Sequence, residues 1–158
     1  MTWDEVGDLD APAPVCSIPA ARMKMKRDHD VPLSPRAAAI LREQRAKRTL
    51  SGFGGHPFVF EGERPRRPLS NTSLSMTLRR TKAEVTAHGF RSSFRSWCAD
   101  HAVAFEVAEA CLAHSSSSVV EAYQRSSMLE RRRPVMEAWA AYLGGETSAN
   151  VVSFRAAG

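Results

Sequence analysis

Apolar residues change their spacing near residue 34, and the change predicts a mixed front followed by a helical remainder. Residues 15–19 and the run from Arg22 to Leu33 look like the short strands of a hairpin or small antiparallel sheet. Ser34-Pro35 then indicates a helix start, because serine is a preferred cap and proline suits the first helical position. We therefore expect a helix over Arg36–Arg48.

The rest of the chain predicts helices separated by several breaks. In chain order, we expect a loop at 52–57, a brief strand at 58–60, a break at 65–68, a helix from Ser70 or Asn71 to about Arg80, and helices from Gly89 to Leu143 with interruptions at 101–104 and 115–118. The predicted fold is α+β, mostly α-helical with a small antiparallel β-sheet near the N-terminus. It has a hairpin at 15–33, a helical part at 34–145 and a flexible tail at 146–158.

Composition places the chain among soluble globular proteins. A length of 158 residues, 43% hydrophobic and 25% charged, suits one domain that buries roughly 70% of its unfolded surface. No stretch approaches the about 20 apolar residues of a membrane span, and the acidic start is not a signal peptide. We expect a protein of the bacterial cytosol. Cys16, Cys98 and Cys111 lack metal-ligand spacing and are expected to be buried thiols.

The net charge of +5 is unevenly distributed. Residues 1–20 hold four acids and no base, residues 21–48 hold nine Lys or Arg against three acids, and residues 64–95 hold eight against one. Two basic blocks of this kind are typical of a surface that neutralises DNA phosphates. The alternative is that these side chains only solvate exposed faces.

His88 and Arg91 lie three positions apart at the start of a predicted helix over Phe90–Ala99, so both side chains can point the same way. A helix N-terminus favours an anion, and a guanidinium adds a planar fork that can hold two phosphate oxygens. The pair therefore suits a phosphodiester. Taken alone, the pair is better explained by His88 as a helix cap and Arg91 in a surface ion pair.

His114 ends a predicted helix that starts at Phe105, and Tyr123 lies in a further helical turn after a serine-rich break. A histidine there can give a proton or a hydrogen bond to a phosphate oxygen, or can simply complement the helix dipole. Tyr123 is one of two tyrosines; the other, Tyr142, lies in an apolar terminal helix and is explained by packing.

The spacing of the set carries more weight than any member. Two residues separate His88 from Arg91, 22 separate Arg91 from His114, and eight separate His114 from Tyr123. This order resembles the tyrosine recombinase (phage integrase) family, and the segments at 112–114, 121–123 and 130–143 look like the end of prophage and genomic-island integrases. The front, with Ile18-Pro19-Ala20 and Val31-Pro32-Leu33-Ser34, resembles the family's β-hairpin. The resemblance covers Trp3 to Leu143 and implies the carboxy-terminal part of an integrase catalytic domain.

The resemblance also implies roles. Tyr123 would attack a DNA phosphate to form a 3′-phosphotyrosyl bond, while Arg91, His88 and His114 stabilise charge on the phosphorane. The family's catalytic lysine falls seven residues before the valine of the Val-Pro-Leu turn, which is Lys24, with Lys26 as the alternative. Lys24 would protonate the leaving 5′ oxygen, unless it only contacts backbone phosphate. The residues expected to bind DNA are Arg22, Lys26, Arg27 and Arg95.

The implied substrate is double-stranded DNA with an attachment site, and the implied partners are other integrase protomers, packed through the C-terminal helix. No cofactor, metal or small-molecule substrate is implied. Family members carry another catalytic arginine in a helix before the segment resembled by Trp3–Val6, and no arginine precedes Arg22 here. We therefore expect a truncated gene or a late start, with impaired strand transfer. Two alternatives stay open: a non-catalytic DNA-binding remnant, and type IB topoisomerase-like strand breakage.

Overall fold

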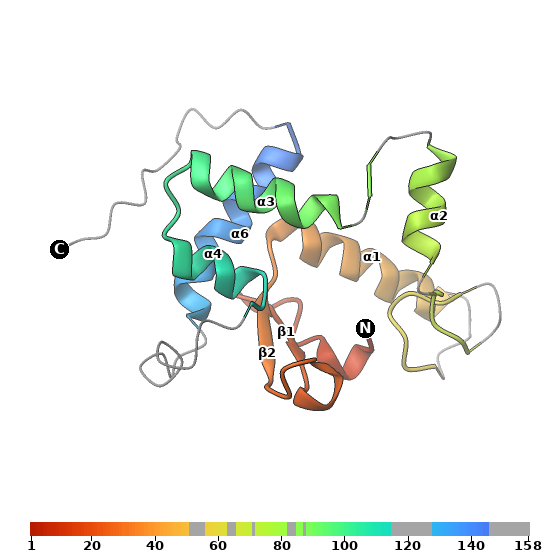
Figure 1. Cartoon of the computed structure of the whole chain (residues 1–158). Helices are drawn as coiled ribbons and strands as arrows, with labels where there is room; N and C mark the ends of the chain where they lie inside the picture. The colour runs from red at the N-terminus through yellow and green to blue at the C-terminus, as the bar shows by residue number, and fades with distance from the viewer. Residues whose placement is uncertain are drawn as a thin grey trace.

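The computed structural model describes residues 1–50, 56–62, 66–70, 72–81, 85–86, 88–114 and 128–145. Helices dominate it, and one two-stranded antiparallel sheet lies near the N-terminus (Figure 1). This arrangement confirms the predicted fold class. The expected tail at 146–158, the break at 115–118 and Tyr123 lie outside the described residues.

The hairpin is shorter than the sequence predicts. Strand β1 (Val15–Ile18) pairs with β2 (His29–Pro32), with Cys16 opposite Val31 and Ile18 opposite His29. The expectation of a strand from Arg22 onward was wrong, because Ala20–Arg22 form a short 3-10 helix, η2. The Asp28 carboxylate accepts the Ala20 N–H at 2.7 Å, and Lys26 adopts a left-handed φ of 53°. A left-handed φ is not compatible with an extended strand.

The segment before the hairpin is joined to it by an ion pair. The 3-10 helix η1 (Trp3–Glu5) carries Glu5, which is nearly buried and accepts hydrogen bonds from the Thr2 N–H and from the Arg22 guanidinium. Burial alone would raise the pKa of Glu5, but these two donors outweigh it and hold the pKa below the ordinary 4.5. Arg22 therefore neutralises a carboxylate that the fold has largely removed from water.

Removing this guanidinium should destabilise the protein. We expect Arg22→Ala to lower the free energy of unfolding by about 1–2 kcal/mol, because Glu5 stays buried while Arg22 is itself half exposed. Chemical denaturation at neutral pH measures the difference. Arg36→Ala, which removes an exposed 3.8 Å pair with Glu43, is the control and should change little.

The Glu5–Arg22 pair determines the direction in which the free energy of unfolding changes with pH. Because the pKa of Glu5 is lower in the folded chain than in the unfolded chain, its contribution is present above about pH 4.5 and is lost as the pH falls toward the folded pKa. The gap between wild type and Arg22→Ala should therefore narrow in acid. A gap that stays constant down to about pH 3 would contradict the assignment.

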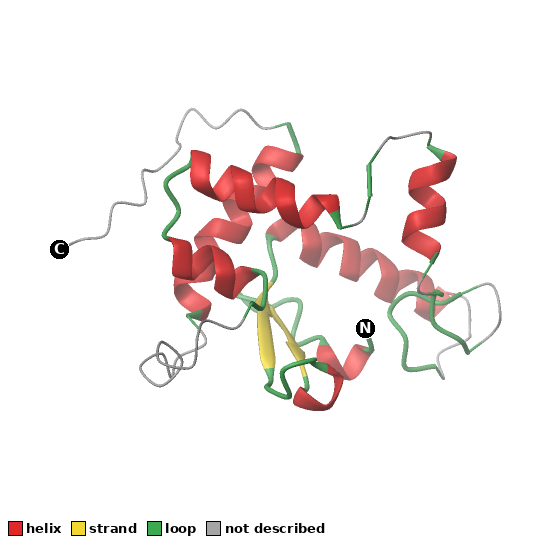
Figure 2. Ribbon diagram, viewed as in Figure 1, coloured by secondary structure: helices red, strands yellow, loops and turns green. Residues whose placement is uncertain are grey.

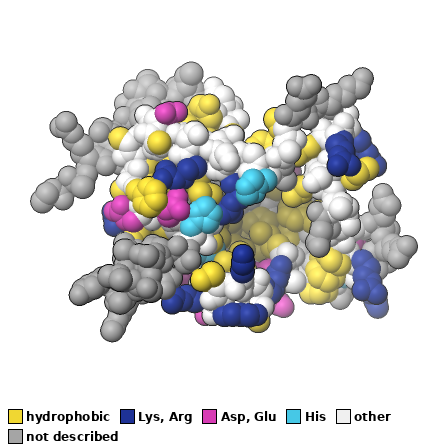
Figure 3. All heavy atoms as spheres, viewed as in Figure 1, with side chains coloured by type: hydrophobic (Ala, Val, Ile, Leu, Met, Phe, Trp, Pro, Cys, Tyr) yellow, Lys and Arg dark blue, Asp and Glu magenta, His cyan; other side chains and the backbone are white. Residues whose placement is uncertain are grey.

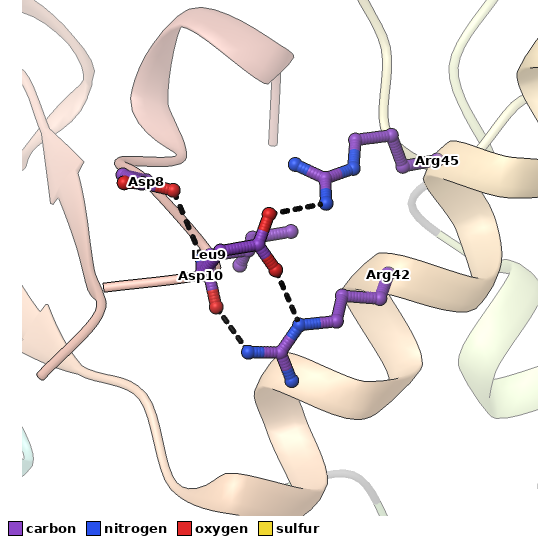
Figure 4. A network of polar contacts seen from close by, with 5 residues as sticks. All are labelled: Asp8, Leu9, Asp10, Arg42 and Arg45. Carbon is purple, nitrogen blue, oxygen red and sulfur yellow. Dashed lines mark hydrogen bonds and ion pairs between the residues drawn. The ribbon is translucent and has the colours of Figure 1, made fainter. Parts of the chain in front are cut away.

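Helix α1 (Pro35–Leu50) begins where the sequence predicts. The Ser34 hydroxyl accepts the Ala37 N–H at 3.3 Å, so the serine caps the helix as expected. Farther along, Arg42 and Arg45 hold the carboxylate of Asp10 at 3.1 Å and 3.0 Å, and Arg42 also donates to the Leu9 carbonyl (Figure 4). Hydrogen bonds from Arg45 and Arg42 lower the pKa of Asp10. These contacts attach α1 to the chain ahead of the hairpin.

The middle of the chain has little regular structure. Residues 58–60 form no strand, which corrects the expectation; Phe58 and Glu61 make isolated bridges to Thr2 and Pro68. The backbone bends at residues 59 and 60, directly after the bridge at Phe58. Helix α2 (Ser73–Arg80) ends as predicted and buries none of its residues. Its N-cap is Thr72, so the expectation of Ser70 in that position was wrong, and Asn71 lies outside the described residues.

Three helices make the larger core: α3 (Gly89–Asp100), α4 (Phe105–Cys111) and α6 (Leu129–Leu143). They lie together above the hairpin in Figure 2. The buried residues of this core are Phe94, Trp97, Cys98, Val103, Val107, Ala108, Met128 and Val135. A second core joins the hairpin to α1 and consists of Leu9, Cys16, Leu33, Ala38, Leu41 and Val59. The break expected at 101–104 is confirmed.

Helix α6 connects the two cores. Arg132 is only 2% exposed, and its guanidinium lies 3.3 Å from His29 Nε2 on β2. Burial, and then the charge of Arg132, lower the pKa of His29. The thiols of Cys16 and Cys98 are buried as predicted, whereas Cys111 is half buried. Burial raises the pKa of Cys98 to about 12, so this thiol is unreactive.

Candidate functional site

Arg91 and His114 come together although 22 residues separate them in the sequence. Arg91 lies in the first turn of α3, and His114 follows the end of α4. Arg91 Nη2 lies 2.7 Å from His114 Nε2 and donates to the Leu112 carbonyl at 2.8 Å. Both side chains are exposed. Two of the residues predicted for phosphate binding therefore form one cationic site that faces solvent.

The end of α4 explains how His114 reaches this position. The helix stops at Cys111, three residues earlier than the sequence predicts, and Ala113 takes a left-handed φ of 54°. The N–H of His114 donates to the Glu109 carbonyl at 3.0 Å, and the N–H of Ala113 donates to Ala110 at 3.2 Å. This pair of bonds is the Schellman motif, which reverses the chain at a helix end. It turns His114 back over the last helical turn, toward α3.

The left-handed alanine makes this turn a weak point. Ala113→Gly should raise the free energy of unfolding by about 0.5–1 kcal/mol, because glycine adopts positive φ without the clash of a β-carbon. Ala110→Gly, inside α4, should lower it by about 1 kcal/mol. Thermal or denaturant unfolding of both variants checks the contrast. Destabilisation by both substitutions would contradict the left-handed turn.

Arg91 already uses one of its nitrogens fully. Nη2 carries two hydrogens, and the Leu112 carbonyl and His114 Nε2 take one each. No other acceptor for this guanidinium occurs among the described residues, so Nε and Nη1 are available to an anion. A two-point grip on a phosphate uses Nη2, and so requires one of its two contacts to be exchanged. The Leu112 acceptor is a main-chain carbonyl held by the fold, so the contact with the His114 side chain is the one that can be exchanged for a phosphate oxygen.

A carboxylate lies behind His114. Glu109 Oε2 is 2.8 Å from His114 Nδ1, and Glu109 Oε1 is 2.7 Å from Arg95 Nε. The Glu109 side chain is 19% exposed, against 46% for His114. Arg95 also lies over the ring of Phe105, with 4.5 Å between the guanidinium carbon and the ring centroid. The site is thus a chain of four side chains, Arg91, His114, Glu109 and Arg95.

The remaining predicted residues are spread more widely. His88 is the N-cap residue of α3 and is exposed, and its side chain makes no cap hydrogen bond. Lys24, Lys26 and Arg27 lie exposed in the connection between the two strands. The Arg91 N–H donates to the His88 carbonyl at 3.0 Å, but among the described residues no side-chain hydrogen bond or ion pair links Lys24 or His88 to the Arg91–His114 pair. The structure therefore brings together Arg91, His114 and Arg95, and leaves the other roles as predictions.

Sequence reasoning missed two residues. Glu109 was not singled out, although it lies five positions before His114 and one signal was available: a helix that ends between them brings such positions together. Arg132 was noted only within the segment 130–143 that resembles integrase ends, yet it is buried. In the part of the chain that the structure describes, no three His, Cys, Asp or Glu side chains gather as metal ligands. No helix there is long and apolar enough for a membrane span.

A mostly helical domain with a hairpin near its start and a paired arginine and histidine is consistent with a tyrosine recombinase catalytic domain. Comparison with known proteins agrees. A family model described as "Phage integrase family" matches residues 1–130. The chain belongs to the phage integrase family.

The similar curated proteins are integrases of prophages and phages. The chain is 38% identical to prophage integrase IntA of Escherichia coli K12 over 95% of its length, and 31% identical to prophage integrase IntZ of the same strain over 87%. It is 31% identical to the integrase of Enterobacteria phage P4 over 89%. The matches span 35%, 33% and 35% of those proteins, so the chain corresponds to about a third of each. No solved structure matches the chain.

Proposed function

We propose that this chain carries the chemistry of site-specific DNA recombination, in which a strand is cut and rejoined through a 3′-phosphotyrosyl intermediate. The observation that carries the proposal is the Arg91–His114 pair, 2.7 Å apart at the facing ends of two helices, in a chain of the integrase family. The pair supports an oxyanion site because a guanidinium and an imidazole can both donate to the oxygens of one phosphate.

In the first step, the Tyr123 hydroxyl attacks the scissile phosphorus and a phosphotyrosyl bond forms as the bond to the 5′ oxygen breaks. Arg91, His88 and His114 stabilise the charge that develops on the phosphorane oxygens. Lys24, on an exposed and flexible stem, gives its proton to the leaving 5′ oxygen, and His88 accepts the proton of the tyrosine. Each proton therefore has a donor and an acceptor within the proposed set.

In the second step, a 5′ hydroxyl of the partner DNA attacks the phosphotyrosine and releases Tyr123. One phosphodiester bond is made for each one broken, so the reaction needs no ATP. The substrate is duplex DNA that contains an attachment site.

Charge on the surface supports DNA as the substrate. Figure 3 shows histidines beside Lys or Arg and Asp or Glu side chains near the centre of one face, with more Lys and Arg across a hollow below them. Lys26 and Arg27 in the strand connection are exposed and suit phosphate contacts. Arg22 and Arg95, also proposed for DNA, are engaged with Glu5 and Glu109 and would have to share their guanidiniums.

We further propose that strand transfer by this chain alone is impaired. The printed sequence contains no arginine before Arg22, and the contact of Arg22 with Glu5 is a reason not to give Arg22 the role of a second phosphate clamp. Loss of one such donor costs about 2.7–4 kcal/mol of transition-state stabilisation, or about 100- to 1,000-fold in rate. If strand transfer is impaired, the alternative function is that of a non-catalytic DNA-binding protein.

The proposed partners are other integrase protomers. Exposed Tyr142 and Leu143 at the end of α6 suit packing against such a protomer.

A nicked duplex that loses the short strand after cleavage tests the function, because the covalent product is trapped. We expect a slow adduct on a denaturing gel with duplexes from the DNA flanking the gene, and peptide mass spectrometry should place the nucleotide on Tyr123. Guanidinium chloride at about 50 mM should raise the rate by supplying a second guanidinium donor to the phosphate. Sodium chloride at the same ionic strength is the control and should not. An adduct on any other residue would overturn the mechanism.

If no adduct forms with or without guanidinium, the chain is not a recombinase on these duplexes, and the DNA-binding alternative is tested next. Binding to the same duplexes, measured by fluorescence anisotropy at several salt concentrations, then distinguishes it from a protein with no DNA function.

A further inference from the structure

The two ring nitrogens of His114 have partners of opposite hydrogen-bonding character. An ionised carboxylate only accepts hydrogen bonds, so Nδ1 must carry the hydrogen in its 2.8 Å contact with Glu109. A guanidinium only donates, so Nε2 must present a lone pair in its 2.7 Å contact with Arg91. One tautomer of the imidazole satisfies both neighbours, with hydrogen on Nδ1 and none on Nε2.

We propose that Glu109 is a positioning residue for the reaction: it fixes this tautomer and orientation of His114, so that Nε2 faces the position of the scissile phosphate. This inference rests on the proposed function and adds a residue to it. Glu109 touches neither substrate nor reacting atoms, and acts through the imidazole alone.

The helix end makes Glu109 suited to this task. The Schellman motif ties the backbone of His114 to the Glu109 carbonyl at 3.0 Å, so side chain and backbone of one residue hold the same histidine. Arg95 takes the other carboxylate oxygen at 2.7 Å and prevents the carboxylate from rotating away. Because only 19% of the Glu109 side chain is exposed, water competes little with His114 and Arg95 for its carboxylate.

The arrangement gives a sequence of events when DNA binds. A phosphate that draws Nη2 of Arg91 onto its own oxygens removes the donor from His114 Nε2. The freed Nε2 can then accept a proton from a buffer acid, whose conjugate base stays in solution, and donate it in a hydrogen bond to a phosphate oxygen, while the carboxylate stays hydrogen-bonded to Nδ1. A carboxylate that orients a catalytic histidine acts in the same way in hydrolytic triads.

The tautomer can be measured on the whole chain without DNA. Nitrogen-15 NMR of histidine-labelled protein, at a pH about two units above the ordinary imidazole value, distinguishes hydrogen on Nδ1 from hydrogen on Nε2. We expect His114, assigned through His114→Gln, to be protonated at Nδ1. Because the Arg91 guanidinium favours the same tautomer, the variants are compared in an Arg91→Met background, where Glu109→Leu should give a mixture of both tautomers and Glu109→Gln, which keeps an acceptor oxygen, should retain the Nδ1 form.

Arg95→Met separates positioning from structural support. It removes the link from Glu109 to α3 and leaves the Glu109–His114 pair, so the Nδ1 tautomer should persist. If Glu109 only braces the helices through Arg95, this variant and Glu109→Leu should behave alike. Circular dichroism and thermal unfolding verify that each variant folds.

The adduct assay supplies the second readout. At saturating DNA, Glu109→Leu should lower the rate of adduct formation about 10- to 100-fold. The DNA concentration that gives half the maximal rate should change little. Glu109→Gln should restore most of the rate. A normal rate in Glu109→Leu, or His114 with hydrogen on Nε2 in the wild type, overturns the inference. Absence of any wild-type adduct would refute the proposed function instead, and the NMR result would still decide how Glu109 holds His114.

Discussion

Replacing Tyr123 with phenylalanine is expected to abolish the covalent DNA adduct, with the rate falling by at least about 1,000-fold. The phenolic oxygen is the atom that would form the bond to phosphorus, and no other group in the proposed set can substitute for it. The substitution removes one oxygen and keeps the ring. Adduct formation on the nicked duplex, with guanidinium present to bring the wild type to a measurable rate, provides the test.

The chain offers a matched control, since its only other tyrosine is Tyr142. That ring lies 5.4 Å from Trp139 and 6.1 Å from Trp97 in an aromatic cluster, and its side chain is exposed. Tyr142→Phe keeps this packing and should leave adduct formation unchanged. Persistence of the adduct in Tyr123→Phe would exclude Tyr123 as the nucleophile, whatever the control shows.

Arg91→Lys should slow adduct formation about 100- to 1,000-fold, although the positive charge is retained. An ammonium group lacks the planar fork, and a lysine at this position cannot reach the Leu112 carbonyl, His114 and a phosphate with one rigid group. Binding to duplex DNA should weaken much less than the rate falls, because the lost contacts matter most in the transition state. Single-turnover rates and anisotropy on the same duplex separate the two effects.

Arg131→Lys is the control for this charge-preserving change. Arg131 lies on α6, is half exposed and pairs with Glu106 at 3.1 Å, and an exposed pair contributes little. Its rate should match that of the wild type. Equal losses in both variants would show that arginine supports the fold in general and would remove Arg91 from the mechanism.

Local signals predicted the helices well. Ser34 and Pro35 mark the start of α1 because capping and the fixed φ of proline act within a few residues. The break after Asp100 was also visible from the sequence. The strand expected from Arg22 onward failed because a carboxylate eight residues away, on Asp28, folds the Ala20 backbone into a turn. Contacts of that kind depend on tertiary position and leave no periodic signal.

The sequence predicted only part of the candidate site, because the rest depends on tertiary contacts. Residue type and spacing identified Arg91 and His114, and the structure places them in contact. The proposed role of Glu109 was missed because it depends on where α4 ends, and the sequence predicted that end three residues too late. The apolar pattern continues toward His114, but the left-handed Ala113 stops the helix early and redirects the chain. Tyr123 remains a prediction outside the described residues.

The anchor of Arg91 is a main-chain carbonyl, at Leu112. Substitution of the leucine side chain leaves that oxygen in place, although it removes a side chain that packs against the larger core. The turn at Ala113 is different, because it determines where the carbonyl points. The Arg91 anchor therefore depends on the turn at Ala113, whereas the leucine side chain contributes through core packing and not through the hydrogen bond.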